Sequence, residues 1–188
     1  MQKNSFKIYS FVNEFNLSDL QQLSKDICII YRNYNKINHL ENILKFKKYC
    51  KNIKTKFYLS NDIKLSIRLR LDGVYIPSFN NKVNYVQNYS LPQNFDIIGS
   101  AHNIAEINLK LKQKCSVIFL SPVFKVNKSK QFLGVNRFNL MTLNKKAHFI
   151  ALGGINEKNY KRIKLLRTNG FASIGWAKKN GLRKLRPF

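Results

Sequence analysis

The sequence predicts a small single-domain α/β protein, a (β/α)₈ TIM barrel, and three observations carry that prediction. Short apolar runs alternate with amphipathic segments along most of the chain. The runs are apolar at consecutive positions, as in parallel strands that helices cover on both faces. Eight such runs fit into 188 residues, which favours a closed barrel, although a smaller one than the usual ~250 residues. No linker or repeat divides the chain, so residues 1–188 are expected to form one domain.

The first third of the chain follows this alternation least regularly. Residues 6–12 are predicted to form a strand with polar interruptions, and residues 27–31 a continuous apolar strand. Between them, residues 18–23 allow only a short helix. Residues 39–50 are predicted to form a longer helix, because four apolar residues form a stripe along one face, namely Leu40, Ile43, Leu44 and Phe46.

The middle of the chain, from residue 56, alternates regularly. Strands are predicted at residues 57–60, 73–76 and 95–99, where β-branched and aromatic residues gather. The helix that separates the first two has its own apolar stripe, made of Ile63, Leu65, Ile67 and Leu71.

The last third continues the pattern with three more strands. They are predicted at residues 117–120, 149–152 and 171–174. A helix over residues 104–111 precedes the first of them, and a helix over residues 160–166 precedes the last.

The chain is strongly basic, with 34 Lys and Arg against 9 Asp and Glu and a formal net charge of +25. Such a charge is typical of nucleic-acid-binding proteins. The basic residues are spread along the chain, however, and many, including those at 110–114, are expected on the solvated faces of helices. Enrichment in Asn, Ile and Lys also indicates a general compositional bias. The charge is therefore expected to attract small phosphorylated ligands, and nucleic acid is the less favoured partner.

The composition excludes several other classes of protein. Apolar residues make up 44% of the chain and aromatic residues 13%, which excludes a disordered basic tail. No apolar stretch approaches the roughly 20 residues of a membrane span, and no secretory signal is visible, so a cytoplasmic protein is expected. Cys28, Cys50 and Cys115 are expected to be buried and reduced, and no His or Cys spacing indicates a metal site. The oligomeric state stays open, a homo-oligomer included.

In a barrel of this kind, functional residues lie in the loops that follow the strands, at the C-terminal end of the barrel. The candidates are Arg32 after the second strand, Asn61 and Asp62 after the third, Ser78 to Asn80 after the fourth, Ser100 and His102 after the fifth, Ser129 and Lys130 after the sixth, Gly153 and Gly154 after the seventh, and Ser173, Ile174 and Gly175 at the eighth.

The strongest single signal is Gly153-Gly154, which ends a strand before a helix expected to open at Asn156. Glycines let backbone N–H groups approach an anion, and a helix N-terminus adds positive partial charge. The loops after strands seven and eight frequently bind phosphate in such barrels. A phosphate site is therefore predicted here. The alternative is a tight turn that needs glycine only for its geometry.

Six short motifs stand out along the chain: DGV at 72–74, IIGSAHN at 97–103, FLSPVF at 119–124, LG at 133–134, RF at 137–138 and ALGGIN at 151–156. Taken in order and with their spacing, they resemble thiamine phosphate synthase and its relative thiazole tautomerase. The resemblance covers about residues 56–176, with a weaker fit from the first strand to Arg32.

The resemblance implies an enzyme of thiamine biosynthesis that couples a hydroxymethylpyrimidine pyrophosphate to a thiazole phosphate and releases pyrophosphate. Matched position by position, it implies catalytic roles for Lys130, Ser100, Arg32 and His102. It implies substrate-binding roles for Ser129, Gly153, Gly154, Ser173, Ile174, Gly175 and Asn61.

The pyrimidine side of the site departs from the family pattern. Of a Gln-x-Arg-x-Lys motif after strand two, only Arg32 remains. Asp62 matches one magnesium carboxylate, but the second falls on Asn80, which lacks the charge that draws Mg²⁺ from water. The resemblance therefore implies Mg²⁺, but only one of its two carboxylate ligands is matched. Arg32 and Lys130 are expected to supply part of the positive charge that Mg²⁺ would provide. Alternatively, Asp62 is only an acid at a helix N-terminus.

Two other functions stay open at this point. An imidazole suits proton transfer near neutral pH, so His102 is compatible with a thiazole tautomerase-like enzyme, or with a member that only binds the thiazole phosphate. A basic nucleic-acid-binding protein on the same scaffold is the second alternative, and its binding would depend steeply on salt. For His102 itself, the structural alternative is a cap on the following helix.

Overall fold

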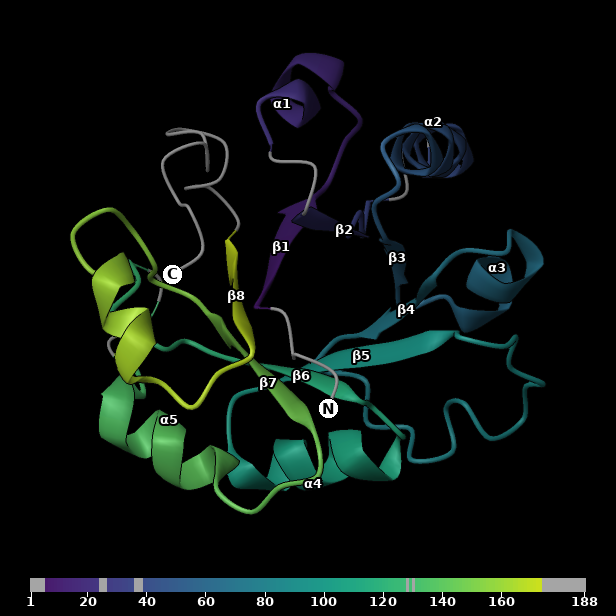
Figure 1. Ribbon diagram of the computed structural model, residues 1–188. Helices are drawn as coiled ribbons and strands as arrows, with labels where there is room; N and C mark the ends of the chain where they lie inside the picture. Colours follow the sequence, from purple (N-terminus) through teal and green to yellow (C-terminus); the bar gives the residue numbers. More distant parts are fainter. Residues whose placement is uncertain (1–5, 24–26, 36–38, 128, 130, 174–188) are drawn as a thin grey trace.

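The computed structural model describes residues 6–23, 27–35, 39–127, 129 and 131–173. Eight parallel strands close into a barrel in sequence order, β1 pairing with both β2 and β8, and helices surround the barrel (Figure 1). The strands are β1 (Lys7–Val12), β2 (Ile27–Tyr31), β3 (Phe57–Ser60), β4 (Gly73–Ile76), β5 (Asp96–Ala101), β6 (Val117–Leu120), β7 (His148–Leu152) and β8 (Gly170–Ser173). The predicted (β/α)₈ barrel is confirmed.

Helices occupy most of the connections between these strands. They are α1 (Leu17–Gln21), α2 (His39–Asn52), α3 (Ile63–Arg68), α4 (Ile104–Lys112), α5 (Gly134–Thr142) and a 3₁₀ helix, η1 (Tyr160–Leu165). The connection from β4 to β5, residues 77–95, consists of turns and contains no helix (Figure 1). None of the helices described is both long and apolar enough for a membrane span.

The structure differs from the predicted helices in two places. The segment after Gly153-Gly154 does not open an α-helix at Asn156, because the Asn156 N–H donates to Asn159 Oδ1 at 2.9 Å and holds a turn. Such local side-chain bonds compete with helix formation, and only the six-residue η1 follows. The helix α5 was not predicted, because it begins at a glycine and leaves Leu140 72% exposed, which weakens its apolar periodicity.

The inside of the barrel is filled mainly by aromatic and branched side chains. Phe119 makes edge-to-face contacts with Tyr9, Phe11 and Tyr75, at centroid distances of 4.9, 5.7 and 5.8 Å. A second, larger cluster lies between the strands and the surrounding helices. The barrel is therefore a packed core, and a ligand can enter only at its ends.

The three cysteines are buried and unpaired, as predicted. Burial raises the pKa of Cys28 to about 11 and those of Cys50 and Cys115 to about 12. Since the thiolate is the reactive form, a thiol reagent at pH 8 should react at least ~100-fold more slowly with the folded protein than with the protein in urea, where all three thiols react. Reaction of any folded-state thiol at the unfolded rate would contradict this prediction.

Candidate active site

A cavity of about 420 Å³ opens at the C-terminal end of the barrel. This volume is within the range of small-molecule sites. Residues from the loops after β2, β4, β5, β6 and β7 line it. The five residues matched to the family that meet there are Arg32, Ser100, His102, Ser129 and Gly153, and Ser78 and Phe79 from the predicted segment after β4 also line the cavity.

Arg32 is held at the mouth of the cavity by its backbone and by two aromatic rings. Its backbone N–H donates to the carbonyl of Val12 at 2.8 Å. Its guanidinium lies 5.1 Å from the centre of the Phe11 ring and 5.9 Å from that of Tyr34, at distances where cation–π attraction acts. Within the described part of the chain, no carboxylate forms an ion pair with it. The guanidinium donors are therefore available to an anion.

Ser100 lies near the end of β5, where its side chain is buried. Burial raises the pKa of Tyr75 to about 12, and the nearby Ser100 hydroxyl acts in the opposite direction. The two hydroxyls form a neutral polar floor beside Arg32 in the same cavity.

His102 does not serve as the side-chain cap of α4. Asn103 takes that role, since its Oδ1 accepts the N–H of Glu106 at 2.9 Å. The His102 ring instead places Nδ1 at 2.8 Å from the carbonyl oxygen of Ser121 and 3.2 Å from its hydroxyl. Because a carbonyl oxygen only accepts, Nδ1 carries the proton of the neutral ring and Nε2 is its basic nitrogen.

The glycine pair meets the geometric requirement that the sequence left open as the alternative to a phosphate site. Gly153 and Gly154 have φ angles of 89° and 74°, which side chains disfavour. A Cβ at Gly154 would overlap the carbonyl of Phe124 and lie 2.6 Å from that of Lys125. Close packing against the loop after β6 thus demands glycine whether or not a ligand binds. A substitution of Gly154 would therefore disturb the fold and is no clean test of an anion site.

The phosphate site itself stays a prediction. Among the residues that the structure describes, the N–H groups of Gly153 and Gly154 have no hydrogen-bond acceptor, as an anion-binding turn requires. Ser173 ends β8, while Ile174, Gly175 and Lys130 lie outside the described residues. Ser129 lies on the cavity and bonds within its own loop, its Oγ donating to the carbonyl of Gln131 at 2.9 Å.

The predicted magnesium ligands do not fit a two-carboxylate metal site. Asp62 caps α3, its Oδ1 accepting the N–H of Leu65 at 2.9 Å. Asn80 is buried, donates to Asn61 Oδ1 at 2.7 Å and accepts from the N–H of Lys82 at 3.1 Å. The amide oxygen that was to replace a carboxylate is therefore already bonded. In the described ranges, no group of three His, Cys, Asp or Glu is placed to hold a metal ion.

A buried lysine lies behind Asn80, where the sequence predicted a solvated one. Lys110 is fully buried on α4, and its Nζ donates to the carbonyls of Pro77 and Asn80 at 2.8 and 3.0 Å and to Gln113 Oε1 at 2.9 Å. Burial lowers the pKa of Lys110. Gln113 in turn donates to the carbonyl of Lys82 at 2.8 Å. This network fixes the first part of the β4–β5 loop.

Sequence reasoning also missed an aromatic rim. Tyr34 and Phe79 are exposed residues of separate loops whose rings lie 5.7 Å apart at the cavity. Tyr34 stands where the family motif has its lysine. Both loops follow strands and were therefore candidate segments, but neither aromatic residue carried a chemical signal of its own.

A family model described as thiamine monophosphate synthase matches residues 21–175, which is most of the chain. The chain belongs to this family. The resemblance seen in the six motifs is thereby confirmed, and the match extends through the less regular first third to residue 21.

Curated relatives are identical to the chain at somewhat more than a quarter of the aligned positions. It is 28% identical to a thiamine-phosphate synthase of Prochlorococcus marinus subsp. pastoris over 147 residues, 77% of this chain and 40% of the relative. It is 27% identical to a thiamine-phosphate synthase of Helicobacter pylori over 126 residues, 64% of this chain and 57% of the relative. The chain thus spans about two fifths of the first of these proteins and over half of the second.

Two solved structures have the same fold as this chain. A thiamine phosphate pyrophosphorylase from Pyrococcus furiosus superposes with a TM-score of 0.77 at 16% identity, covering 96% of this chain and 92% of that one. A thiamine phosphate pyrophosphorylase from Bacteroides thetaiotaomicron gives a TM-score of 0.56 at 18% identity, covering 96% and 89%. The barrel is retained across this sequence distance.

Proposed function

We propose that the protein is a thiamine phosphate synthase and that the 420 Å³ cavity is its active site. The observation that carries the proposal is that Arg32, Ser100, His102, Ser129 and Gly153, all matched to the family from sequence, lie on that one cavity. Membership of the family supports the same reaction. The substrates would be a hydroxymethylpyrimidine pyrophosphate and a thiazole phosphate.

In the proposed reaction, the bond between the pyrimidine methylene carbon and the pyrophosphate oxygen breaks, and its electron pair leaves with pyrophosphate. The thiazole nitrogen then donates its lone pair to the methylene carbon. The guanidinium of Arg32 stabilises the charge that develops on the departing pyrophosphate, the usual role of preorganised cations at such centres. Ser100 donates a hydrogen bond to the same group, and Lys130 is assigned there by its sequence match alone.

The thiazole phosphate is assigned to the part of the cavity formed by the loop after β7. The backbone N–H groups of Gly153 and Gly154 would bind its phosphate, and Ile174 and Gly175 are assigned there by their sequence match alone. Ser129 would contact the thiazole. No step is routed through Mg²⁺, because Asp62 and Asn80 do not fit the metal. Asn61 Oδ1 accepts a hydrogen bond from Asn80, and the substrate-binding role of Asn61 stays a prediction.

Separate titrations of the two substrates test this assignment. Each substrate should bind with a 1:1 ratio. Ser100→Ala should lower the affinity for the pyrimidine pyrophosphate by about 10-fold, the scale of one hydrogen bond to a charged group. The affinity for the thiazole phosphate should not change. Ser116→Ala is a matched control, since Ser116 is exposed just before β6 at the other end of the barrel. Binding of neither substrate would overturn the proposal.

Asp62 gives a direct test of the metal question. Asp62→Asn should change the synthase rate by less than about 3-fold, because Asn is as good an N-cap as Asp and only the charge is lost. Asp62→Ala, which removes the cap, should lower the free energy of unfolding by about 1 kcal/mol. A loss of activity of ~100-fold or more in Asp62→Asn, with stability retained, would show that the carboxylate binds metal after all.

The geometry of His102 favours proton transfer as a second candidate activity. With Nδ1–H donated to Ser121, the basic Nε2 belongs to a ring that lines the cavity. In a tautomerase assay, His102→Gln should lower the rate by about 100-fold, the usual scale for a lost general base. The synthase rate should fall far less, since the coupling step moves no proton. A tautomerase rate that survives the substitution would rule out this role.

A further inference from the structure

Two exposed aromatic rings lie side by side at the cavity of the candidate active site. Tyr34, in the loop after β2, is 53% exposed, and Phe79, in the loop after β4, is 60% exposed. Both residues line the cavity, and their ring centres lie 5.7 Å apart with the ring planes at 66°. Because neither ring is packed into the core, both leave aromatic surface open to a ligand.

The loop that carries Phe79 is held in place by buried side chains. The carbonyls of Pro77 and Asn80, on either side of Phe79 in the sequence, accept hydrogen bonds from Lys110 Nζ at 2.8 and 3.0 Å. Gln113 Nε2 donates to the same Asn80 carbonyl at 3.0 Å. An exposed ring on a fixed backbone loses little conformational freedom when it stacks on a ligand, so the surface is preorganised for binding.

The loop that carries Tyr34 is shaped by the asparagine before it. Asn33 Oδ1 accepts the N–H of Asn35 at 3.0 Å, which forms an Asx turn around Tyr34. Asn33 Nδ2 donates to the hydroxyl of Tyr31 at 3.1 Å. Since Tyr31 is fully buried at the end of β2, this bond ties the turn to the barrel. The backbone on which Tyr34 is presented therefore has a defined geometry.

A cation lies next to the aromatic pair. The guanidinium of Arg32 is 5.9 Å from the centre of the Tyr34 ring, and it lines the same cavity as both rings. A planar ring that is joined by a single carbon to an anion bound at Arg32 would therefore reach Tyr34 and Phe79. In a hydroxymethylpyrimidine pyrophosphate, one methylene group joins the ring to the pyrophosphate. The spacing of cation and rings matches this substrate.

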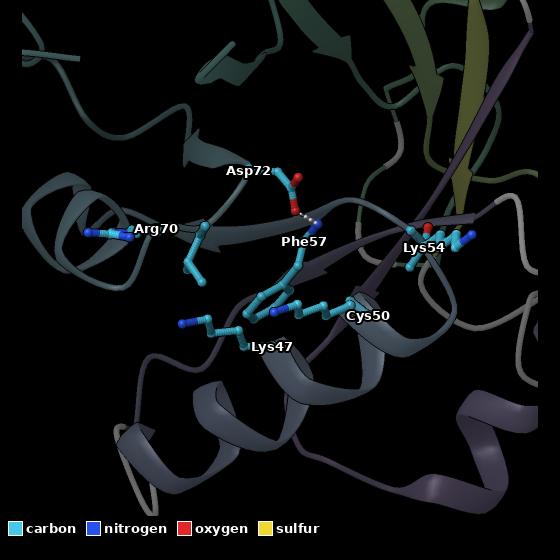
Figure 2. A pocket seen from close by; sticks show the side chains of 9 residues that line it. Lys47, Cys50, Lys54, Phe57, Arg70 and Asp72 are labelled. Atoms are coloured by element: carbon cyan, nitrogen blue, oxygen red, sulfur yellow. Dashed lines mark hydrogen bonds between the residues drawn. The ribbon is translucent and has the colours of Figure 1, made fainter. Parts of the chain in front are cut away.

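A second cavity, of about 350 Å³, lies between α2 and α3 and differs in this respect (Figure 2). The apolar residues on its described lining are Cys50, Phe57 and Leu71, which are at most 7% exposed. Lys54 and Arg70 lie on opposite sides of it (Figure 2). A planar ligand would find no exposed ring among these described residues. The open aromatic surface thus belongs to the cavity of the candidate active site.

We infer that Tyr34 and Phe79 recognise the pyrimidine ring of the substrate, which stacks on them while its pyrophosphate lies on Arg32. This inference rests on the proposed synthase function and adds to it the residues that select the heteroaromatic ring. The two residues act on binding, because the ring stays stacked on them while the bond to pyrophosphate breaks. Their loss should therefore raise the KM for the pyrimidine substrate and leave kcat within about 3-fold of wild type.

Titration of the full chain with hydroxymethylpyrimidine pyrophosphate and with inorganic pyrophosphate separates the ring from the anion. The pyrimidine compound should bind at least ~10-fold more tightly, the scale of one base stacked on an aromatic side chain. Tyr34→Ala/Phe79→Ala should lower its affinity by about 10-fold or more and leave that of inorganic pyrophosphate within about 3-fold. Tyr34→Phe, which keeps the ring, should bind both ligands as the wild type does.

The control is Tyr89→Ala, which removes an exposed tyrosine of the same β4–β5 connection that lies outside the cavity. Its affinity for either ligand should stay within about 2-fold of wild type. Intermolecular nuclear Overhauser effects on the wild-type complex locate the pyrimidine independently of any variant. They should connect the pyrimidine protons to the ring protons of Tyr34 and Phe79.

The inference is overturned if the two ligands bind equally well, if the double variant and the control lose affinity alike, or if the pyrimidine protons contact only other residues of the cavity. Formation of thiamine phosphate in any of these cases would leave the synthase function standing. Ring-dependent binding without product would overturn the synthase function alone. Failure of the pyrimidine compound to bind at all would overturn both.

Discussion

Replacing Arg32 with glutamine should lower the rate of thiamine phosphate formation by about 10²–10³-fold, the scale observed when one preorganised group that stabilises developing charge is removed. Arg32 is the described cation on the cavity of the candidate active site, and pyrophosphate gains charge as it leaves. The variant should fold normally, since the guanidinium contributes only cation–π contacts worth about 0.5–1 kcal/mol at an exposed site.

The matched control for Arg32 is Arg68→Gln, an exposed arginine in the last turn of α3. Its rate at saturating substrate should stay within about 2-fold of wild type. An Arg32→Gln rate within about 3-fold of wild type would show that the charge on pyrophosphate is stabilised elsewhere.

Replacing Lys110 with methionine should lower the free energy of unfolding by about 2–5 kcal/mol, because it leaves buried hydrogen-bond acceptors unsatisfied at about 1–3 kcal/mol each. Methionine retains most of the length of the side chain but leaves three buried acceptors, the carbonyls of Pro77 and Asn80 and the Oε1 of Gln113, without the Nζ donor. Urea unfolding measures the change directly.

Lys112→Met is the control for Lys110, because Lys112 is exposed on the same helix and substitutions at such positions usually stay within about 0.5 kcal/mol. A loss below about 1 kcal/mol in Lys110→Met would mean that water or a rearranged loop replaces the ammonium. The synthase KM should also rise in the variant, since the same network holds the loop that carries Phe79 to the cavity.

The strands could be predicted from sequence because each is a short apolar run, and the order of the runs implied the closure of the barrel. The 3₁₀ helix after Asn156 and the helix α5 could not. In the first, asparagine side chains bond to the nearby backbone. In the second, the helix starts at a glycine with φ of 67°. Both depend on local geometry that apolar periodicity does not report.

The same distinction holds for the site. The barrel rule located Arg32, Ser100 and His102, because strand ends converge in any closed barrel. The rule could not identify the hydrogen bonds of Lys110, whose Nζ donates to the carbonyl of Pro77, 33 positions earlier in the sequence. Nor could it show that Asn80 turns its amide oxygen toward Lys82. These contacts arise from tertiary packing. They determine which of the side chains matched to the family are free to bind a ligand.

The formation of product from both substrates tests the central claim most directly. Purified protein would be incubated with the hydroxymethylpyrimidine pyrophosphate and the thiazole phosphate, once with Mg²⁺ and once with a chelator, and thiamine phosphate and pyrophosphate would be quantified over time. We expect the two products to appear in equal amounts and Arg32→Gln to slow the formation of both. Absence of product under both conditions, with each substrate shown to bind, would contradict the assignment of a synthase.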